Sequence, residues 1–254
     1  MIHEDRVKTL RPGTPARGAF VLYWMQASQR AEHNHALEFA VERANDLDLP
    51  VAVLFCLTDS YPEANLRHYM FMLQGLRETV AALASRGIST LVIRGAPDVV
   101  APQVALRAAM VVTDRGYLRH QRAWRARVAE RLTCPFVQVE TDAVVPVETA
   151  STKAEYTAAT LRPRIGRILL RYLVPVQERQ VVRPPHQFSD ASIELSDIDS
   201  VLATLAVDTS VNGVPTLRGG ATEAERLLAT FLDEYLDDYV QHRSNPARPC
   251  TSRL

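Results

Sequence analysis

The stretch Ala19–Ala40, AFVLYWMQASQRAEHNHALEFA, decides the fold that the sequence predicts. It opens with seven apolar residues rich in aromatic and branched side chains, which is typical of a strand buried on both faces. Polar residues follow from Gln26 to Arg30, and from Ala31 the apolar residues recur at helical spacing. Strand, polar loop and helix form the first unit of a doubly wound α/β domain. Such domains bind ligands at the carboxyl ends of their strands.

The same unit recurs along the next hundred residues. Further strands are expected at 51–57, 89–94, 110–113 and 136–140, and helices at about 65–86, after Pro97 and at 117–132. Five strands alternating with helices predict a five-stranded, doubly wound parallel sheet of Rossmann-like type, with the strand order 3-2-1-4-5. The sequence contains neither GxGxxG after the first strand nor GxxxxGK[ST], which argues against a dehydrogenase and a phosphate-cradling NTPase.

The chain divides into four predicted parts. Residues 1–18 are interrupted by proline and glycine and predict an irregular arm, and residues 19–150 form the α/β domain. Residues 151–220 read as a linker, with a short extended piece before it at 144–147 and helices expected at 165–173 and 198–205. Residues 221–254 begin with a helix that leads into a polar tail, which suggests that a second domain follows in the parent protein.

The helix expected at 221–242 carries a capping box, with Thr222 as N-cap and Glu225 three residues later. Its apolar stripe consists of Leu227, Leu228, Phe231, Leu232, Tyr235, Leu236 and Tyr239. A stripe of this kind normally packs against a domain.

Composition limits the function classes. The 254 residues carry 29 basic and 29 acidic side chains, and this +0 balance gives no overall attraction to nucleic acid or membrane. Arginines cluster at 117–131 and 162–171, where solvated helix faces are the simpler interpretation. Three distant cysteines, no signal peptide and no membrane-length apolar run predict reduced thiols, no metal site and a cytoplasmic protein, which we expect to be a monomer.

Several segments together resemble one protein family. They are VLYWMQASQRAEHNHALEFA (21–40), PEANLRHYMFMLQGL (62–76), RGI (86–88), VTDRGYLRHQRAWR (112–125), VVPVETASTKAEYTAATLRPRI (144–165) and GGATEAERLLATFLDEYLDDY (219–239). In this order they resemble class II cyclobutane-pyrimidine-dimer photolyases, of the photolyase/cryptochrome family. The resemblance spans nearly the whole chain.

The resemblance implies a function and two domains. An N-terminal α/β domain holds a light-harvesting antenna, and a larger helical domain holds FAD, binds damaged DNA and repairs pyrimidine dimers with blue light. This chain resembles the first domain, the linker and the start of the second. The catalytic helices have no counterpart, so the resemblance implies no catalytic residue here, and neither repair nor DNA binding is expected of this chain alone.

Two sets of cofactor contacts are expected. By resemblance, Tyr239, Thr251 and Ser252 contact the FAD phosphates. In the predicted strand order the first and fourth strands are neighbours, so their ends could form an antenna pocket for a deazaflavin or a folate. Its candidate residues are Trp24, Met25, Gln26, Arg30, Asn34 and Asp114.

Structural roles for the same residues remain open. Trp24 and Met25 suit a protein core, Arg30 could pair with a surface carboxylate, and Asp114 could cap the following helix. A rival function also stands, a non-catalytic α/β module that binds a chromophore or nucleotide. Exposure of the stripe on residues 221–242 would favour the photolyase, whereas a covered stripe would favour the module.

Overall fold

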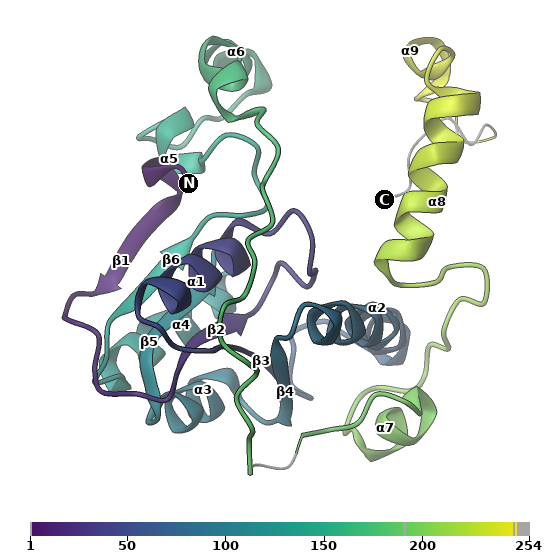
Figure 1. Cartoon of the computed structure of the whole chain (residues 1–254). Coiled ribbons are helices and arrows are strands. Elements are labelled where there is room, and N and C mark those ends of the chain that lie inside the picture. The colour runs from purple at the N-terminus through teal and green to yellow at the C-terminus, as the bar shows by residue number, and fades with distance from the viewer. Residues whose placement is uncertain (1, 190–191, 246, 248–254) are drawn as a thin grey trace. The chain divides into compact units, whose positions relative to one another are not determined.

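The computed structural model describes residues 2–189, 192–245 and 247 (Figure 1). They belong to two compact units, each of which is described by itself. The first contains Met1–Ser60 and Val80–Glu194, and the second contains Tyr61–Thr79 and Leu195–Leu254.

The first unit is built on a six-stranded sheet in the order β1-β6-β5-β2-β3-β4. The strands are β1 (Val7–Arg11), β2 (Phe20–Met25), β3 (Val51–Leu57), β4 (Ser89–Arg94), β5 (Ala108–Asp114) and β6 (Phe136–Val139). Strands β2 to β6 are parallel, and their order confirms the predicted 3-2-1-4-5 arrangement.

The sixth strand, β1, corrects the prediction of a five-stranded sheet and of an irregular arm over residues 1–18. It pairs antiparallel with β6, with Val7 opposite Val139, and follows a short 3-10 turn at Glu4–Arg6. Its residues are half-buried or exposed, as is usual for an edge strand. The sequence VKTLR is too short and too polar to match the pattern of a fully buried strand.

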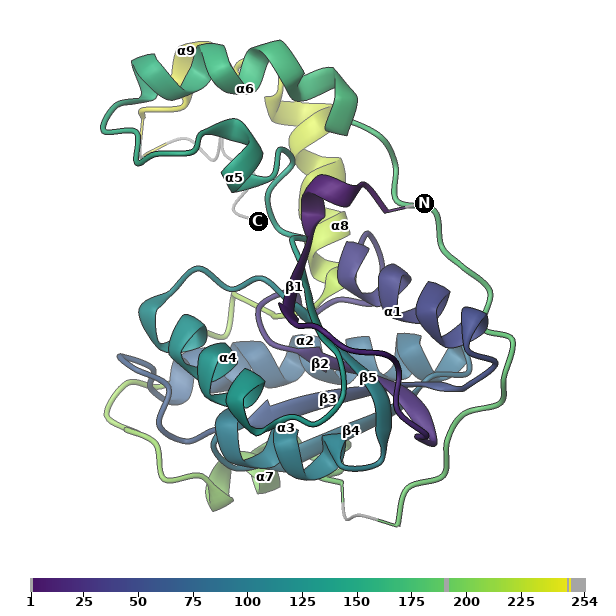
Figure 2. The same cartoon turned by 90° about the vertical axis from the view of Figure 1, so that its left-hand side faces the viewer.

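Helices cover both faces of the sheet (Figures 1 and 2). Helix α1 (His35–Asp46) and the last turn of α2 (Leu66–Ser85) cover one face, and α3 (Pro97–Ala105) and α4 (Arg119–Arg131) cover the other. Side chains of β2 alternate between these two layers, with Tyr23 toward α1 and Trp24 toward α3 and α4. Each such large, fully buried side chain contributes about 2–3 kcal/mol through the hydrophobic effect.

Most helix boundaries lie close to the predicted ones, and Gly87, at φ +74°, ends α2 as expected. Helix α6 (Ala158–Tyr172) starts earlier than predicted because the Thr157 side chain caps it. The extended piece expected at 144–147 is not a strand. Its last residue, Val147, instead begins a single helical turn, α5 (Val147–Ala150).

The linker segment 174–189 has no regular secondary structure, as predicted, yet it is held along α1. Asn45 Nδ2 donates to the Gln180 carbonyl at 2.8 Å, and Asn45 Oδ1 accepts from the Val182 N–H at 3.2 Å. The Arg183 side chain pairs with Asp48. Farther along, Ile193 N–H donates to the Val92 carbonyl of β4 at 2.8 Å, and Ser192 Oγ accepts from the Val92 N–H at 3.0 Å.

The second unit contains the first turns of α2, α7 (Ile198–Thr204), α8 (Ala221–Thr230), a π-helical turn (Phe231–Tyr235) and α9 (Tyr239–His242). Helix α7 matches the helix expected at 198–205. Gly219 packs so closely on α2 that a Cβ would collide with the Phe71 carbonyl. The N-cap of α8 is Gly220, so the predicted capping box is wrong. The Thr222 N–H instead donates to Glu78.

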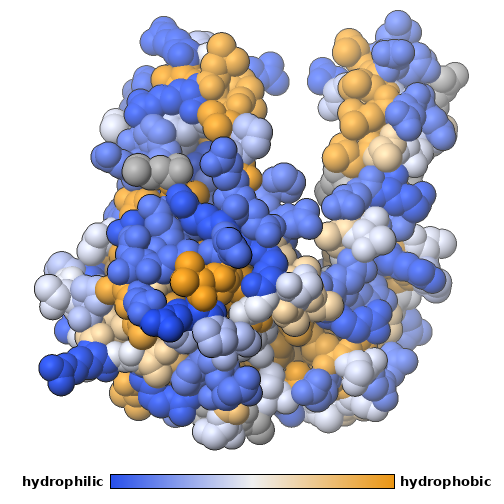
Figure 3. Space-filling view, in the orientation of Figure 1, coloured by the Kyte–Doolittle hydropathy of each residue, from blue (hydrophilic) through white to orange (hydrophobic). Residues whose placement is uncertain are grey.

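Within the described residues, nothing between 221 and 242 is buried. The most exposed apolar side chains form an i, i+4 row, Leu228, Leu232, Leu236 and Val240. Figure 3 shows apolar side chains gathered along α8. None of the described helices combines the length and apolarity that a bilayer crossing needs.

Candidate functional site

The loop that follows β2 is organised around one buried carboxylate. Asp114 ends β5 and is fully buried, and it accepts backbone N–H groups from Gln26 at 2.7 Å, Ala27 at 2.5 Å and Ser28 at 2.8 Å. Hydrogen bonds to a charged group stabilise by about 1.5–3 kcal/mol each. Asp114 therefore holds the loop and does not cap α4, whose N-cap is Leu118.

Asn34 holds the other end of the same loop. Its Oδ1 accepts the Leu37 N–H at 3.0 Å, which caps α1. Its Nδ2 donates to the carbonyls of Ser28 at 3.1 Å and Arg30 at 2.9 Å and to the Tyr23 hydroxyl at 3.1 Å. Burial raises the pKa of Asp114, whereas the three loop N–H groups lower it. The loop and its two anchors thus form one satisfied polar network.

The structure separates Trp24 from Met25. Both are buried, but they face opposite sides of the sheet. The Trp24 ring stacks on Phe136 with centroids 6.2 Å apart. No single ligand on one face of the sheet could therefore contact both side chains.

Two of the expected antenna residues keep accessible surface at the strand ends. Arg30 pairs with Asp142 at 3.0 Å and donates to the Thr141 carbonyl at 3.3 Å. Gln26 is partly exposed, and its Nε2 donates to Thr113 Oγ1 at 3.4 Å, whereas its Oε1 is buried and has no hydrogen-bond partner within the described residues. Gln26 and Arg30 are the candidates of this set with surface to offer a ligand.

Tyr239, expected to contact FAD, lies in α9 and is half-buried. Its ring packs edge-on against Phe231, with centroids 5.7 Å apart. The other two expected contacts, Thr251 and Ser252, lie outside the described residues.

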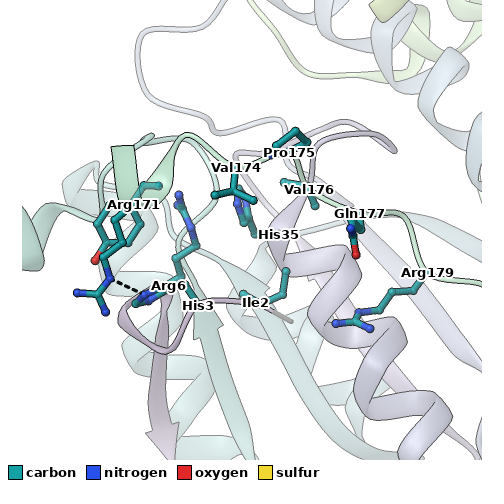
Figure 4. Close-up of a pocket in the computed structure, with 11 residues that line it drawn as sticks. Ile2, His3, Arg6, His35, Arg171, Val174, Pro175, Val176, Gln177 and Arg179 are labelled. Atoms are coloured by element: carbon teal, nitrogen blue, oxygen red, sulfur yellow. Dashed lines mark hydrogen bonds between the residues drawn. The ribbon is translucent and has the colours of Figure 1, made fainter. Parts of the chain in front are cut away.

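A cavity of about 290 Å³ lies in the first unit, beside the start of α1 (Figure 4). It is lined by Ile2, His3, Arg6, His35, Arg171, Tyr172, Val174, Pro175, Val176, Gln177 and Arg179. None of the residues expected at the antenna pocket lines it. The lining comes from three distant segments, the N-terminal arm, α1 and the end of α6 with the linker.

Arg6 is the most buried cation of this cavity, with 4% of its surface exposed. Its guanidinium donates to the carbonyls of Glu140 at 3.2 Å, Ala143 at 2.9 Å and Val144 at 2.6 Å. Sequence reasoning missed it because the arm was expected to be irregular. Recognising VKTLR as a strand would have brought Arg6 to this edge of the sheet.

Burial, together with the positive charges of Arg6 and Arg30 and the neighbouring His33, lowers the pKa of His35 to about 4. Between the ordinary pKa of a histidine and about pH 4, the unfolded chain therefore binds more protons than the folded chain. Folding stability should fall as pH drops through that window.

We expect His35→Gln to remove part of this acid sensitivity. Between about pH 7 and about pH 5, urea midpoints should fall less for the variant than for the parent chain. His33→Gln, at an exposed neighbouring position, serves as the control and should follow the parent. Equal acid losses in all three proteins would contradict the assignment.

Metal and thiol chemistry have little support in the described part of the chain. No group of three or more His, Cys, Asp or Glu side chains there could hold a metal ion. Burial raises the pKa of Cys56 to about 12, so this thiol stays protonated and unreactive at neutral pH.

Comparison with known proteins decides the family. A sequence model of the family described as DNA photolyase matches residues 21–183, more than half of the chain. The chain belongs to the DNA photolyase family.

Curated photolyases are similar along the whole chain. A deoxyribodipyrimidine photo-lyase of Methanothermobacter thermautotrophicus is 41% identical over 261 residues, which cover 100% of this chain and 56% of the relative. A protein of the same name from Potorous tridactylus is 34% identical over 240 residues, covering 93% of this chain and 44% of the relative. The chain thus spans about half the length of these photolyases, their N-terminal part.

Solved structures show the same fold. A class III photolyase from Agrobacterium tumefaciens superimposes with a TM-score of 0.69 at 19% identity, over 95% of this chain and 50% of its own. A photolyase from Sulfolobus tokodaii, described with two FAD molecules, gives 0.66 at 17% identity, over 92% and 50%. At these identities the likeness concerns the photolyase fold alone.

Proposed function

We propose that this chain is the N-terminal, light-harvesting part of a class II cyclobutane-pyrimidine-dimer photolyase. The observation that carries the proposal is the 41% identity to a deoxyribodipyrimidine photo-lyase over the whole of this chain. The class II assignment rests on the segments whose sequence resembles that class. The whole-length protein would use light and FAD to repair pyrimidine dimers in damaged DNA.

The part of this chain in that function is to hold an antenna chromophore at the carboxyl ends of β2 and β5. The loop after β2 is rigid because Asp114 and Asn34 satisfy its backbone. A rigid loop suits energy transfer, which requires a fixed chromophore. The partly exposed Gln26 side chain can contact a deazaflavin or folate ring, and Arg30 can meet an anionic substituent.

The described residues do not by themselves fit FAD. Of the three expected contacts only Tyr239 is described, and its ring is engaged with Phe231. One hydroxyl cannot hold a dinucleotide. We therefore assign no repair step to this chain and expect it to be inactive alone. The exposed apolar row on α8 agrees with a helical portion that packs there in the whole-length protein.

DNA would be bound mainly by that other portion. Three of the five arginines of α4 have partners: Arg125 donates to the Gly116 carbonyl at 2.6 Å, Arg127 pairs with Asp98 at 2.5 Å, and Arg131 donates to the Asp98 carbonyl at 2.7 Å. We propose no nucleic-acid site on this helix. The monomeric state and the cytoplasmic location stay predictions.

An absorption spectrum of the purified chain, before and after addition of FAD and of a deazaflavin, tests the proposal. A deazaflavin band that stays with the protein, without flavin and without dimer repair under blue light, is the expected result. Gln26→Leu should weaken the deazaflavin, and Gln177→Leu, away from the loop, is its control. Retained FAD with light-dependent repair would overturn the assignment of repair to the other portion.

The rival function is a binding module without catalysis, complete in itself. Cover of the α8 row by the rest of the chain would favour this module, whereas an exposed row would favour the photolyase.

The α8 row allows a direct test of the two functions. Because its side chains are exposed, the double change Leu232→Gln and Leu236→Gln should alter the free energy of unfolding by about 0.5 kcal/mol or less. Leu73→Gln, at a fully buried position of α2, should cost about 3 kcal/mol or more. Urea unfolding followed by circular dichroism measures both. A double variant as unstable as Leu73→Gln would show that the row is covered in solution and would favour the module.

A further inference from the structure

The cavity beside α1 has a positive lining. Three arginines and two histidines contribute to it, and its lining residues include no aspartate or glutamate. Figure 4 shows Arg6 and His35 reaching into the same space from the arm and from α1. The lowered pKa of His35 agrees with a positive potential there.

The partners of the arginines leave this potential only partly balanced. The hydrogen bonds of the Arg6 guanidinium all go to carbonyl oxygens, and three of its five donors are used. Arg179 pairs with Glu42 at 2.7 Å. Arg171 Nε donates to His3 Nε2 at 2.9 Å, and its guanidinium lies 3.6 Å from Asp5, a looser pair on a side chain that is 58% exposed. An anion could gain charge-assisted hydrogen bonds from the donors of Arg6 and Arg171 that remain.

Part of the lining is apolar. Ile2 and Val174–Val176 supply it, whereas the Tyr172 ring is already covered by Arg6 and Arg171, each about 5.6–5.7 Å from its centroid. The volume of about 290 Å³ is at the lower end of ligand pockets. Such a space suits a compact body with one charged end and offers no aromatic face for a large stacked ring.

We propose that this cavity binds a compact organic anion, whose phosphate or carboxylate lies on the side of Arg6 and Arg171 and whose apolar body lies against Ile2 and Val174–Val176. The site is separate from the antenna loop, and the proposal does not depend on the proposed function.

Calorimetric titration of the whole chain with phenyl phosphate, inorganic phosphate and benzyl alcohol tests the proposal. Phenyl phosphate should bind most tightly, inorganic phosphate more weakly, and benzyl alcohol not measurably. The affinity should fall as salt rises from about 0.05 M to about 0.3 M. Absence of saturable binding of phenyl phosphate would overturn the proposal.

Two variants at exposed positions of the lining locate the site. Arg171→Gln should weaken phenyl phosphate about fivefold or more, and Val174→Asp should do the same by placing a carboxylate in the apolar wall. Arg167→Gln, one turn earlier on α6 and outside the lining, should change the affinity by no more than about twofold. If Arg167→Gln weakens binding as much as Arg171→Gln, the contact is nonspecific and the proposal fails.

The antenna proposal and the proposal of an anion site can fail independently of each other. Deazaflavin should leave the phenyl phosphate titration unchanged. Displacement of phenyl phosphate by deazaflavin would place the chromophore in this cavity and overturn the proposal of a separate site.

Discussion

Asp114→Asn is expected to lower the free energy of unfolding of the first unit by about 3 kcal/mol or more. The carboxylate is fully buried and accepts three backbone N–H groups. An asparagine in its place offers one oxygen and turns an NH₂ group toward those donors, so at least one buried N–H loses its acceptor. Both tryptophans, Trp24 and Trp124, belong to this unit, so urea unfolding followed by their fluorescence measures the change.

Asp48→Asn provides the matched control. Asp48 pairs with Arg183 on the surface, where 65% of its side chain is exposed. Exposed ion pairs contribute about 1 kcal/mol at most. If the two variants unfold at the same urea concentration, Asp114 does not support the loop as described. Loss of the deazaflavin band in Asp114→Asn at a urea concentration where the unit is folded would further connect loop rigidity with the antenna.

Glu38→Gln is expected to have the second large effect. Glu38 on α1 pairs with Arg86 at 2.8 Å, with side chains that are 3% and 10% exposed. It also accepts the Arg179 N–H at 2.7 Å. Breaking one side of a buried ion pair typically costs about 3–5 kcal/mol. Among the described residues, Arg86 would keep only one carboxylate partner, Glu178, at 3.4 Å and with 60% of the glutamate side chain exposed, so we expect a cost at the lower end of this range. We expect lower stability and faster proteolytic cleavage within the linker segment 174–189.

The control for this prediction is Glu223→Gln on α8. Glu223 pairs at 2.7 Å with Arg226, whose side chain is 60% exposed, and the loss of this surface pair should change stability by about 0.5 kcal/mol or less. Cleavage sites are identified by mass spectrometry of the fragments. Unchanged cleavage of 174–189 in Glu38→Gln would show that other contacts, such as those of Asn45, suffice to hold the linker.

The parallel part of the sheet was predictable because its strands are buried on both faces. Runs such as Val51–Leu57 contain no polar residue and cannot be solvent-facing helices or loops. Strand β1 was not predictable in this way, because an edge strand needs only some apolar residues and its partner lies more than a hundred residues away. Helix α1 starts at His35 because Asn34 caps it. This start was not predictable, because the position of the Asn34 side chain depends on its contacts with the loop.

The candidate site shows a similar limit. Topology correctly brought Asp114 next to the loop after β2, since neighbouring parallel strands end at one edge. Sequence reasoning could not tell whether Asp114 faces a ligand or the protein's own backbone, because the direction of a side chain depends on the surrounding loops. The cavity was beyond prediction for the same reason. Its residues meet only when irregular segments fold back on the sheet.

The contact between the linker and β4 protects this protein against aggregation. Strand β4 is an outer strand of the sheet, and an uncovered outer strand offers its backbone N–H and C=O groups to any other chain. Ser192 and Ile193 occupy both backbone groups of Val92. A protein shortened to residues 19–150, the predicted limits of the α/β domain, would expose this edge and lose β1 from the other. This shortened protein should aggregate through strand pairing even though its core is intact. The linker is therefore needed to protect the α/β domain from such pairing.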